Sequence, residues 1–245
     1  MNGCRIFVTV PRKGRRHNIQ EDLEMSATRE QMVDRRFKEW ESRTNRSVAP
    51  AKSVEKVVSI SGEYGAMGDT VAELVAKDLG FTLYDRKLIQ MIADRSHVEP
   101  SIVEAVEQRE HTYLTEIFDE LIGNVELGDS EYAKRLSEVV GLVGANGAAV
   151  ILGRGANVLL GPKRALRVRC IAPDAVRVQR ISEILSLSKF EAGEAMAVED
   201  ARRAHWVKSM VGVDLNHPGH YDIIINTDTF SLESASRAIV AAYRS

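Results

Sequence analysis

From Val57 to the end of the chain, short apolar runs alternate with segments that have helical periodicity. Each run contains valine, isoleucine or leucine, and the five runs are 56–61 (KVVSIS), 81–85 (FTLYD), 148–153 (AAVILG), 164–172 (RALRVRCIA) and 221–227 (YDIIINT). Apolar strands separated by helices are typical of a parallel sheet that is buried on both faces. The pattern therefore predicts an α/β fold with a five-stranded parallel sheet and helices on both faces.

The segments between these runs repeat apolar residues at helical spacing. The first of them, DTVAELVAKDLG, places Val71, Leu74, Val75 and Leu79 on one face, and Gly80 is a stop signal. By the same criteria we expect further helices over 86–96, 100–123, 130–147, 173–185, about 189–210 and 231–243.

The first part of the chain has a different composition. Between Pro11 and Lys56, arginine, glutamate and serine dominate, and four apolar residues recur at helical spacing: Met32, Val33, Phe37 and Trp40. This spacing predicts an amphipathic helix that begins near residue 28. We expect a partly flexible N-terminal extension over residues 1–53, with this one helix, followed by the main domain over 54–245.

The role of this helical arm stays open at the level of the sequence. It can pack on its own domain or on a second copy of the chain, which would make the protein a homo-oligomer. The basic cluster PRKGRRH at 11–17 offers a third interpretation, contact with a phosphate-rich partner such as a nucleic acid. Short basic runs are usually only solvated, so we do not expect nucleic-acid binding.

Composition and charge argue against several classes of function. The 245 residues carry a formal net charge of -2, and the pI is about 6.3, which argues against general affinity for nucleic acid or anionic membranes. No apolar segment reaches the ~20 residues that a membrane span needs. Cys4 and Cys170 share no metal-ligand spacing and form no disulfide framework, so we expect a cytoplasmic protein without a metal site built from protein side chains alone.

The turn after the first predicted strand, SGEYGAMGDT, is rich in glycine. A phosphate cradle needs glycines that let backbone N–H groups converge on the anion, next to the N-terminus of a helix. Gly62, Gly65 and Gly68 provide such a scaffold, but the lysine of the G-x-x-x-x-G-K-[ST] pattern is missing. The motif alone is therefore equally compatible with a turn that serves only close packing.

The turn LGRGAN after the third strand is a second candidate for phosphate binding. In parallel α/β sheets, ligands bind at the carboxyl ends of the strands. Arg154 stands there between Gly153 and Gly155, where its planar guanidinium can bind a phosphate.

Further arginines follow on two predicted helices. Arg177 and Arg180 lie on one helix face, while Asp200 and Arg203 are one turn apart on the next helix. An i, i+3 Asp and Arg pair is usually a modest surface interaction. Arginines that converge on one cleft, however, are what phosphoryl transfer requires, because the charge on the transferring group must be neutralised.

The order of these features resembles the cytidylate kinase-like family of P-loop nucleoside monophosphate kinases. The features are the glycine loop, GRG, VRCIAPDAVRVQR, a D-x-x-R helix and YDIIINTD, and the resemblance covers about residues 57–243. It is greatest with the branch whose loop reads S-R-E-Y-G-S-G-G. The segment LYDRKLI also resembles the family's segment after its second strand.

The resemblance implies a role for each matching residue. The loop residues would bind the donor nucleotide: Gly62, Glu63, Tyr64, Gly65, Ala66, Met67, Gly68, Asp69 and Thr70. Asp85, Arg86, Arg154 and Asp200 would bind the acceptor side, and Arg154, Arg177, Arg180 and Arg203 would act on the transferring phosphate.

The chain departs from the family pattern at several of these positions. Gly68 stands where the loop lysine belongs, and Gly62 and Met67 replace an arginine and a glycine of the closer branch. Gly155 replaces the aspartate of G-R-D, and Met91 the arginine of the acceptor segment.

The resemblance implies an ATP-dependent kinase that uses Mg²⁺ and transfers a phosphoryl group to a nucleoside monophosphate, with CMP or dCMP as the first candidates. Its ligands would be a nucleoside triphosphate and a nucleoside monophosphate. The alternative is a nucleotide-binding regulatory protein with weak or no turnover, which the absent lysine and the acidic Glu63 both favour.

Overall fold

Five strands form one parallel sheet in the structure, which is a computed structural model and describes residues 56–86, 89 and 131–245. The strands are β1 (Val57–Gly62), β2 (Thr82–Tyr84), β3 (Ala149–Leu152), β4 (Ala165–Ile171) and β5 (Ile223–Asn226). Their order across the sheet is β2-β3-β1-β4-β5, with Val58 level with Val150 on one side and with Leu166 on the other. The predicted parallel five-stranded sheet is confirmed, and β1 lies at its centre.

Helices connect these strands in the described part of the chain. They are α2 (Gly68–Leu79), α6 (Glu131–Asn146), α7 (Ala156–Leu159), α8 (Gly161–Arg164), α9 (Asp174–Leu185), α10 (Lys189–Val211) and α11 (Leu232–Arg244), with a short 3-10 helix, η1 (Pro218–His220). The helices predicted within 100–123 and in the N-terminal arm lie outside the described residues, as does nearly all of the one predicted for 86–96. Those parts stay predictions.

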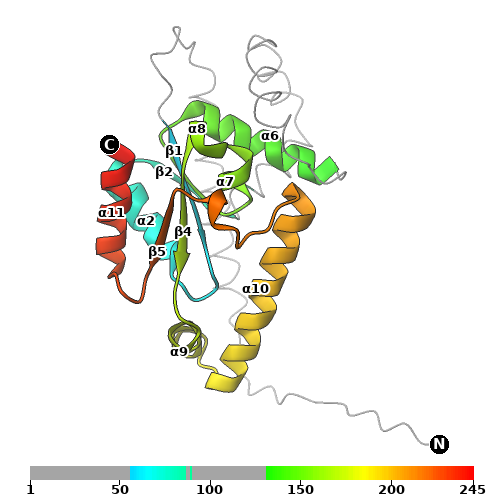
Figure 1. The fold of residues 1–245 in the computed structure, drawn as a ribbon, viewed down its shortest axis with the longest axis vertical. Helices are drawn as coiled ribbons and strands as arrows, with labels where there is room; N and C mark the ends of the chain where they lie inside the picture. Colours follow the sequence, from blue (N-terminus) through cyan, green and yellow to red (C-terminus); the bar gives the residue numbers. More distant parts are fainter. Residues whose placement is uncertain (1–55, 87–88, 90–130) are drawn as a thin grey trace, which may run out of the picture. The chain divides into compact units, whose positions relative to one another are not determined.

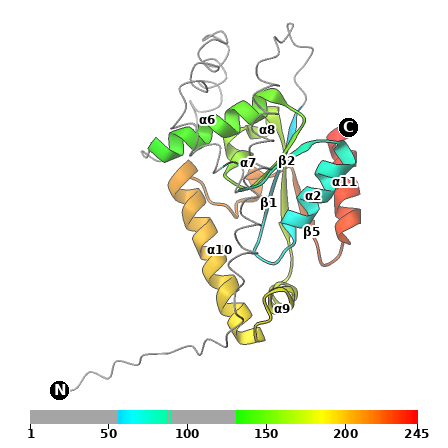
Figure 2. The same cartoon turned by 180° about the vertical axis from the view of Figure 1, so that it is seen from behind.

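The helices cover both faces of the sheet, as the sequence predicts (Figure 1). On one face, α2 and α11 pack together against residues such as Val58 and Ile60 of β1, and they lie side by side in Figure 1 and Figure 2. On the other face, α6, α7 and the C-terminal half of α10 pack against residues such as Val57 and Ile151. Alternate residues of β1 therefore belong to two separate cores, because successive side chains of a strand point to opposite faces.

Local signals explain where the helices begin and end. Ser188 starts α10 with a capping box, in which its side chain accepts the N–H of Glu191 while the Glu191 carboxylate accepts the N–H of Ser188. Gly80 ends α2 in a left-handed conformation that few other residues adopt cheaply. In the described part of the chain, no helix is both long and apolar enough to cross a membrane.

Two helices were not predicted. α7 and α8 have four residues each; α7 follows Gly155 and α8 begins at Gly161, and these glycines have positive φ angles of 68° and 59°. A helix of one turn presents no repeat of apolar positions, so periodicity cannot detect it.

Candidate functional site

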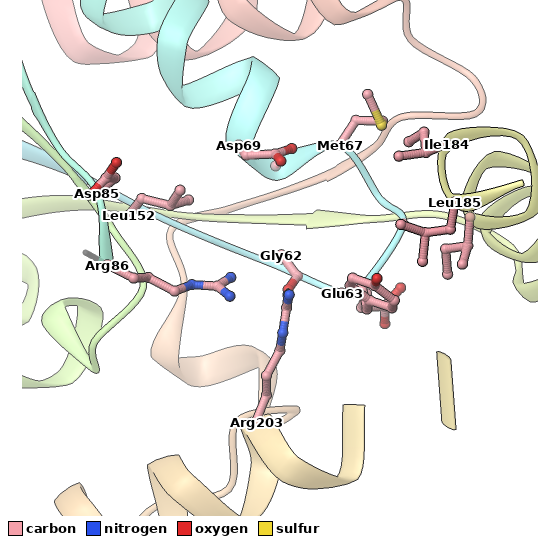
Figure 3. A pocket seen from close by; sticks show the side chains of 14 residues that line it. Gly62, Glu63, Met67, Asp69, Asp85, Arg86, Leu152, Ile184, Leu185 and Arg203 are labelled. Atoms are coloured by element: carbon pink, nitrogen blue, oxygen red, sulfur yellow. The ribbon is translucent and has the colours of Figure 1, made fainter. Parts of the chain in front are cut away.

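The candidate site is a cleft at the carboxyl ends of β1, β2 and β3. Its volume is about 360 Å³. The residues that line it come from the loop after β1, the end of β2, the end of β3, and helices α9 and α10: Gly62, Glu63, Tyr64, Gly65, Met67, Gly68, Asp69, Asp85, Arg86, Leu152, Ile181, Ile184, Leu185 and Arg203. This is the edge of a parallel sheet where ligands are expected, and Figure 3 shows the side chains that face it.

The glycine-rich loop runs from the end of β1 to the start of α2. It turns sharply, because the N–H of Ala66 donates to the Glu63 carbonyl at 3.1 Å. Gly65 has a φ of +84°, and Met67 adopts the left-handed conformation with a φ of 54°. Among the residues that the structure describes, the backbone N–H groups of Gly65, Met67 and Gly68 have no hydrogen-bond partner. The loop therefore presents free donors beside a helix N-terminus, which suits a phosphate.

Two arginines extend into this cleft from different elements. Figure 3 shows the guanidinium groups of Arg86, just after β2, and Arg203, on α10, both pointing toward Gly62. Arg203 donates from Nη1 to the Gly62 carbonyl at 3.0 Å and from Nε to Glu199 at 2.7 Å, and it lies 5.2 Å from the ring centre of Tyr64. Arg203 is thus fixed against the loop while it lines the cleft.

The environment of these arginines shifts two pKa values. Burial, followed by the positive charge of Arg203, lowers the pKa of Arg86 to about 10. Hydrogen bonds from Arg202 and Arg203 lower the pKa of Glu199 to about 2, although partial burial opposes them. Arg86 and Arg203 thus bring two positive charges close together in the cleft, and Glu199 remains charged beside Arg203.

Arg154 does not line the cleft. Its guanidinium donates to the backbone carbonyl of Arg86 at 3.0 and 3.3 Å and lies 5.2 Å from the ring centre of Trp206. Arg154 itself has a φ of 58°. The GRG turn therefore brings the Arg154 guanidinium to the backbone of Arg86, which lines the cleft, whereas Arg154 does not.

Arg177 is buried at the junction of the loop, α9 and α10. Its guanidinium pairs with Asp200 at 2.5 Å and with Asp174 at 2.7 Å, and it donates to the Tyr64 carbonyl at 3.1 Å. Burial alone would lower the pKa of Arg177, but the hydrogen bonds to the two aspartates outweigh burial and raise it. Asp200 also accepts the N–H of Tyr64 at 3.0 Å, so this pair joins the loop to both helices.

Glu63 interacts with the same junction from the loop. Its carboxylate lies 3.7 Å from Nε of Arg177 and 3.9 Å from Nη2 of Arg169, and it accepts the N–H of Ala172 at 3.3 Å. In the described residues, Nε of Arg177 is buried and has no hydrogen-bond partner. Glu63 thus balances the charge of two buried arginines, which its position in a glycine loop did not predict.

Arg180 also binds the loop from outside the cleft. It donates to the side chain and the carbonyl of Thr227 at 3.0 and 2.8 Å and to the Gly65 carbonyl at 3.4 Å. Thr227 in turn donates to the Ala66 carbonyl at 3.0 Å. Of the four arginines predicted to act on a phosphate, the structure brings only Arg203 into the cleft, whereas Arg177 and Arg180 support the loop and Arg154 supports the residue after β2.

The remaining predicted residues lie near the loop. Asp69 and Asp85 line the cleft, and the Asp69 carboxylate accepts the N–H of Thr70 at 3.0 Å. Ala66, within the loop, is fully buried. No group of three or more His, Cys, Asp or Glu side chains that could hold a metal ion occurs in residues 56–86, 89 and 131–245.

Sequence reasoning missed Glu199, Trp206 and Thr227. Each contacts an arginine of the site, through Arg203, Arg154 and Arg180 respectively. Glu199 was detectable, because it stands four residues before Arg203 on a predicted helix, the spacing of a helical ion pair. The other two contacts join segments far apart in the sequence and leave no local signal.

Known proteins resemble this chain in sequence. The model of the cytidylate kinase-like family matches residues 57–229. The cytidylate kinase of Methanobrevibacter smithii is 25% identical over 188 residues, which cover 77% of this chain and 98% of that protein. A uronate isomerase of Corynebacterium glutamicum is 32% identical over 95 residues, but these cover 38% of this chain and only 18% of that protein's length.

The fold also matches a solved structure. The crystal structure of an uncharacterized protein from Eubacterium ventriosum has a TM-score of 0.59 and 18% sequence identity, and the match covers 78% of this chain and 99% of that one. At this identity the likeness concerns the fold alone.

Proposed function

Because this chain belongs to the cytidylate kinase-like family, we propose that it transfers the terminal phosphoryl group of ATP to a nucleoside monophosphate, with CMP and dCMP as the first candidates. The observation that carries the proposal is the convergence of Arg86, Arg203 and the loop N–H groups on one cleft. The resemblance to a cytidylate kinase over nearly its whole length supports the choice of acceptor.

In this mechanism the protein acts by positioning and by electrostatics. The loop N–H groups and the N-terminus of α2 would bind the donor phosphates, while Arg203 would neutralise charge on the transferring group. Arg177 and Arg180 keep the loop in shape through the Tyr64 and Gly65 carbonyls. No covalent intermediate on the protein is needed, and no step requires a general base with a shifted pKa.

Mg²⁺ fits the oxygen groups at this cleft. The ion usually keeps several waters and takes one or two carboxylates plus substrate phosphates, so a full cage of protein ligands is not needed. Asp69 and Asp85 line the cleft and, with Thr70 beside the loop, would hold the ion. When bound, Mg²⁺ would supply charge neutralisation on the donor phosphates.

A second function is favoured by one specific observation. Gly68 stands where the lysine of such loops belongs, and the cleft is lined by the acidic side chain of Glu63. A loop with this composition would bind a nucleotide more weakly, and the protein would then act as a nucleotide sensor with little or no turnover. We propose this as the alternative to the kinase.

A phosphoryl-transfer panel separates the two functions. The full chain is incubated with ATP and Mg²⁺ and with CMP, dCMP, UMP or AMP, and product nucleoside diphosphate is quantified. Binding of ATP is measured in parallel by calorimetry. Turnover on any acceptor establishes the kinase, whereas ATP binding without turnover supports the sensor. If the folded chain binds no nucleotide, both proposals fail.

We further propose that the protein acts in the cytoplasm and that its N-terminal extension, residues 1–53, mediates self-association. Both rest on the sequence alone.

A further inference from the structure

The guanidinium of Arg86 has an unusual environment. It is half-buried and extends into the cleft (Figure 3), yet within the described residues it has no hydrogen-bond or ion-pair partner of its own. The positive charges of Arg203 and Arg154 act on it unfavourably, and the carboxylates of Glu199 and Asp69 offset them in part. A half-buried cation that no carboxylate contacts directly costs free energy in the absence of a ligand, so a bound anion would stabilise it.

The turn after β3 makes room for this side chain. Gly153 has a φ of +73°, and a Cβ added there would lie 3.2 Å from Nε of Arg86. A side chain at this position would require the Arg86 guanidinium to shift by a few tenths of an ångström. The first glycine of GRG therefore serves Arg86.

The arginine of the same turn fixes the backbone of Arg86. Two nitrogens of Arg154 donate to the Arg86 carbonyl, and the Trp206 ring lies beside the Arg154 guanidinium. Arg154 does not line the cleft, so its contact with Arg86 is its link to the contents of the cleft.

We propose that Arg86, together with Arg203, binds a nucleotide phosphate in this cleft, and that Arg154 is a positioning residue for Arg86. This inference rests on the proposed nucleotide site. It also explains how a loop with glycine in place of lysine at position 68 obtains positive charge, since Arg86, after β2, and Arg203, on α10, supply it from outside the loop. The phosphate can belong to the acceptor or be the terminal phosphate of the donor.

Calorimetric titration distinguishes these sources. CMP and a non-hydrolysable ATP analogue with Mg²⁺ are titrated separately into the full chain and into Arg86→Ala, Arg86→Lys, Arg154→Ala and the double variant Arg86→Ala/Arg154→Ala. Arg237→Ala, an exposed arginine on α11, is the matched control. Thermal unfolding of each variant confirms that it is folded.

We expect Arg86→Ala to lower the affinity for one of the two nucleotides by about 10- to 100-fold, the usual effect of one charge-assisted contact. The affinity for the other should fall by less than about 3-fold. If the affinity for CMP falls, Arg86 binds the acceptor phosphate. If the affinity for the ATP analogue falls, Arg86 binds the terminal phosphate of the donor. Arg86→Lys should retain part of the affinity, because it keeps the charge. Arg154→Ala should lower the affinity for the same nucleotide by a smaller factor.

The double variant tests the positioning role. If Arg154 acts through Arg86, the double variant binds no more weakly than Arg86→Ala alone, whereas additive losses mean that Arg154 contacts the phosphate itself and overturn the role. If Arg86→Ala loses affinity for both nucleotides equally, or for neither, the phosphate assignment is overturned while the proposed function stands. If the unaltered chain binds neither nucleotide, the proposed function fails and this inference with it.

Discussion

The carboxylate of Asp200 on α10 accepts the backbone N–H of Tyr64 in the glycine loop at 3.0 Å, although the two residues are 136 positions apart. The same carboxylate pairs with Arg177 of α9. One side chain therefore joins three segments of the site, and the shape of the loop depends on the position of α9 and α10.

Replacing Asp200 with asparagine should lower the free energy of unfolding by about 1–2 kcal/mol. Removal of one partner from a fully buried ion pair costs about 3–5 kcal/mol, and we expect less because the Asp200 side chain is 32% exposed and Asp174 still pairs with Arg177. Urea unfolding measures the change, with exposed Asp228→Asn as the control. Equal stabilities of the two variants would contradict the role of the pair.

Gly65 is the loop glycine whose replacement should cost most. An added Cβ would lie 3.0 Å from the Arg177 carbonyl, and the φ of +84° is unfavourable for any other residue. We expect Gly65→Ala to destabilise the protein by about 1–3 kcal/mol. Gly80→Ala is the matched control, because Gly80 has a similar φ of +69° but nothing within 4 Å of the added atom. A loss in Gly65→Ala no larger than in Gly80→Ala would show that the contact with Arg177 is unimportant.

The strands and long helices could be predicted because their signals are local. The run at 148–153 is continuously apolar, and the structure places β3 (Ala149–Leu152) within it, buried on both faces. Similarly, α10 ends at Val211 before a left-handed Gly212, one residue beyond the predicted end.

The roles of the arginines could not be predicted in the same way. Spacing places Arg177 and Arg180 on one helix face, but only the packing of α9 against the loop shows that this face meets backbone carbonyls. Arg154 stands at a strand end, yet its guanidinium contacts the Arg86 carbonyl and the Trp206 ring and does not line the cleft. These contacts depend on tertiary structure and leave no periodic trace in the sequence.

Low pH should lower the free energy of unfolding partly through protonation of Glu199. Its pKa is lowered from 4.5 to about 2 by the hydrogen bonds from Arg202 and Arg203, so the folded state favours the charged form. This stabilisation is fully present above about pH 4.5 and is lost as the pH falls through about 2. Glu199→Gln should therefore be less stable than the unaltered chain at pH 6, and the difference should shrink between pH 4.5 and 2.

Urea unfolding at several pH values checks this prediction. Exposed Glu233→Gln on α11 serves as the control and should show no such convergence. A stability difference for Glu199→Gln that stays constant with pH would count against the ion pairs with the two arginines.

Deletion of residues 1–51 tests the proposed boundary at residue 53. We expect the remaining chain to fold, because every strand of the sheet begins at or after Val57. Circular dichroism and thermal unfolding report the fold, and light scattering reports the oligomeric state. A change in oligomeric state alone identifies the extension as an interface, whereas failure to fold means that it belongs to the core.

Restoring a lysine in the loop tests whether the loop binds phosphate. Gly68 is the first residue of α2 and is not among the glycines with positive φ, and an added Cβ would lie in ordinary contact, 3.4 Å from Gly62 Cα and 3.5 Å from Cys170 Cβ. The added Cβ is therefore tolerated, and because Gly68 is buried, thermal unfolding checks that Gly68→Lys folds. Its ammonium would add a positive charge to the cleft lined by Gly68, where we place the donor phosphates.

We expect Gly68→Lys to bind the ATP analogue about 10-fold more tightly, at the lower end for a charge-assisted contact because Glu63 lines the same cleft and competes for the ammonium. Gly68→Gln, with a neutral side chain of similar length, is the control and should not tighten binding. If Arg86 normally supplies charge to the donor phosphates, Gly68→Lys should also restore part of the ATP affinity lost in Arg86→Ala, since both cations would act on the same anion. A folded Gly68→Lys that binds ATP no better than Gly68→Gln would mean that the loop does not hold the donor phosphates, and the glycines would then serve only the close packing of β1, α2 and β4.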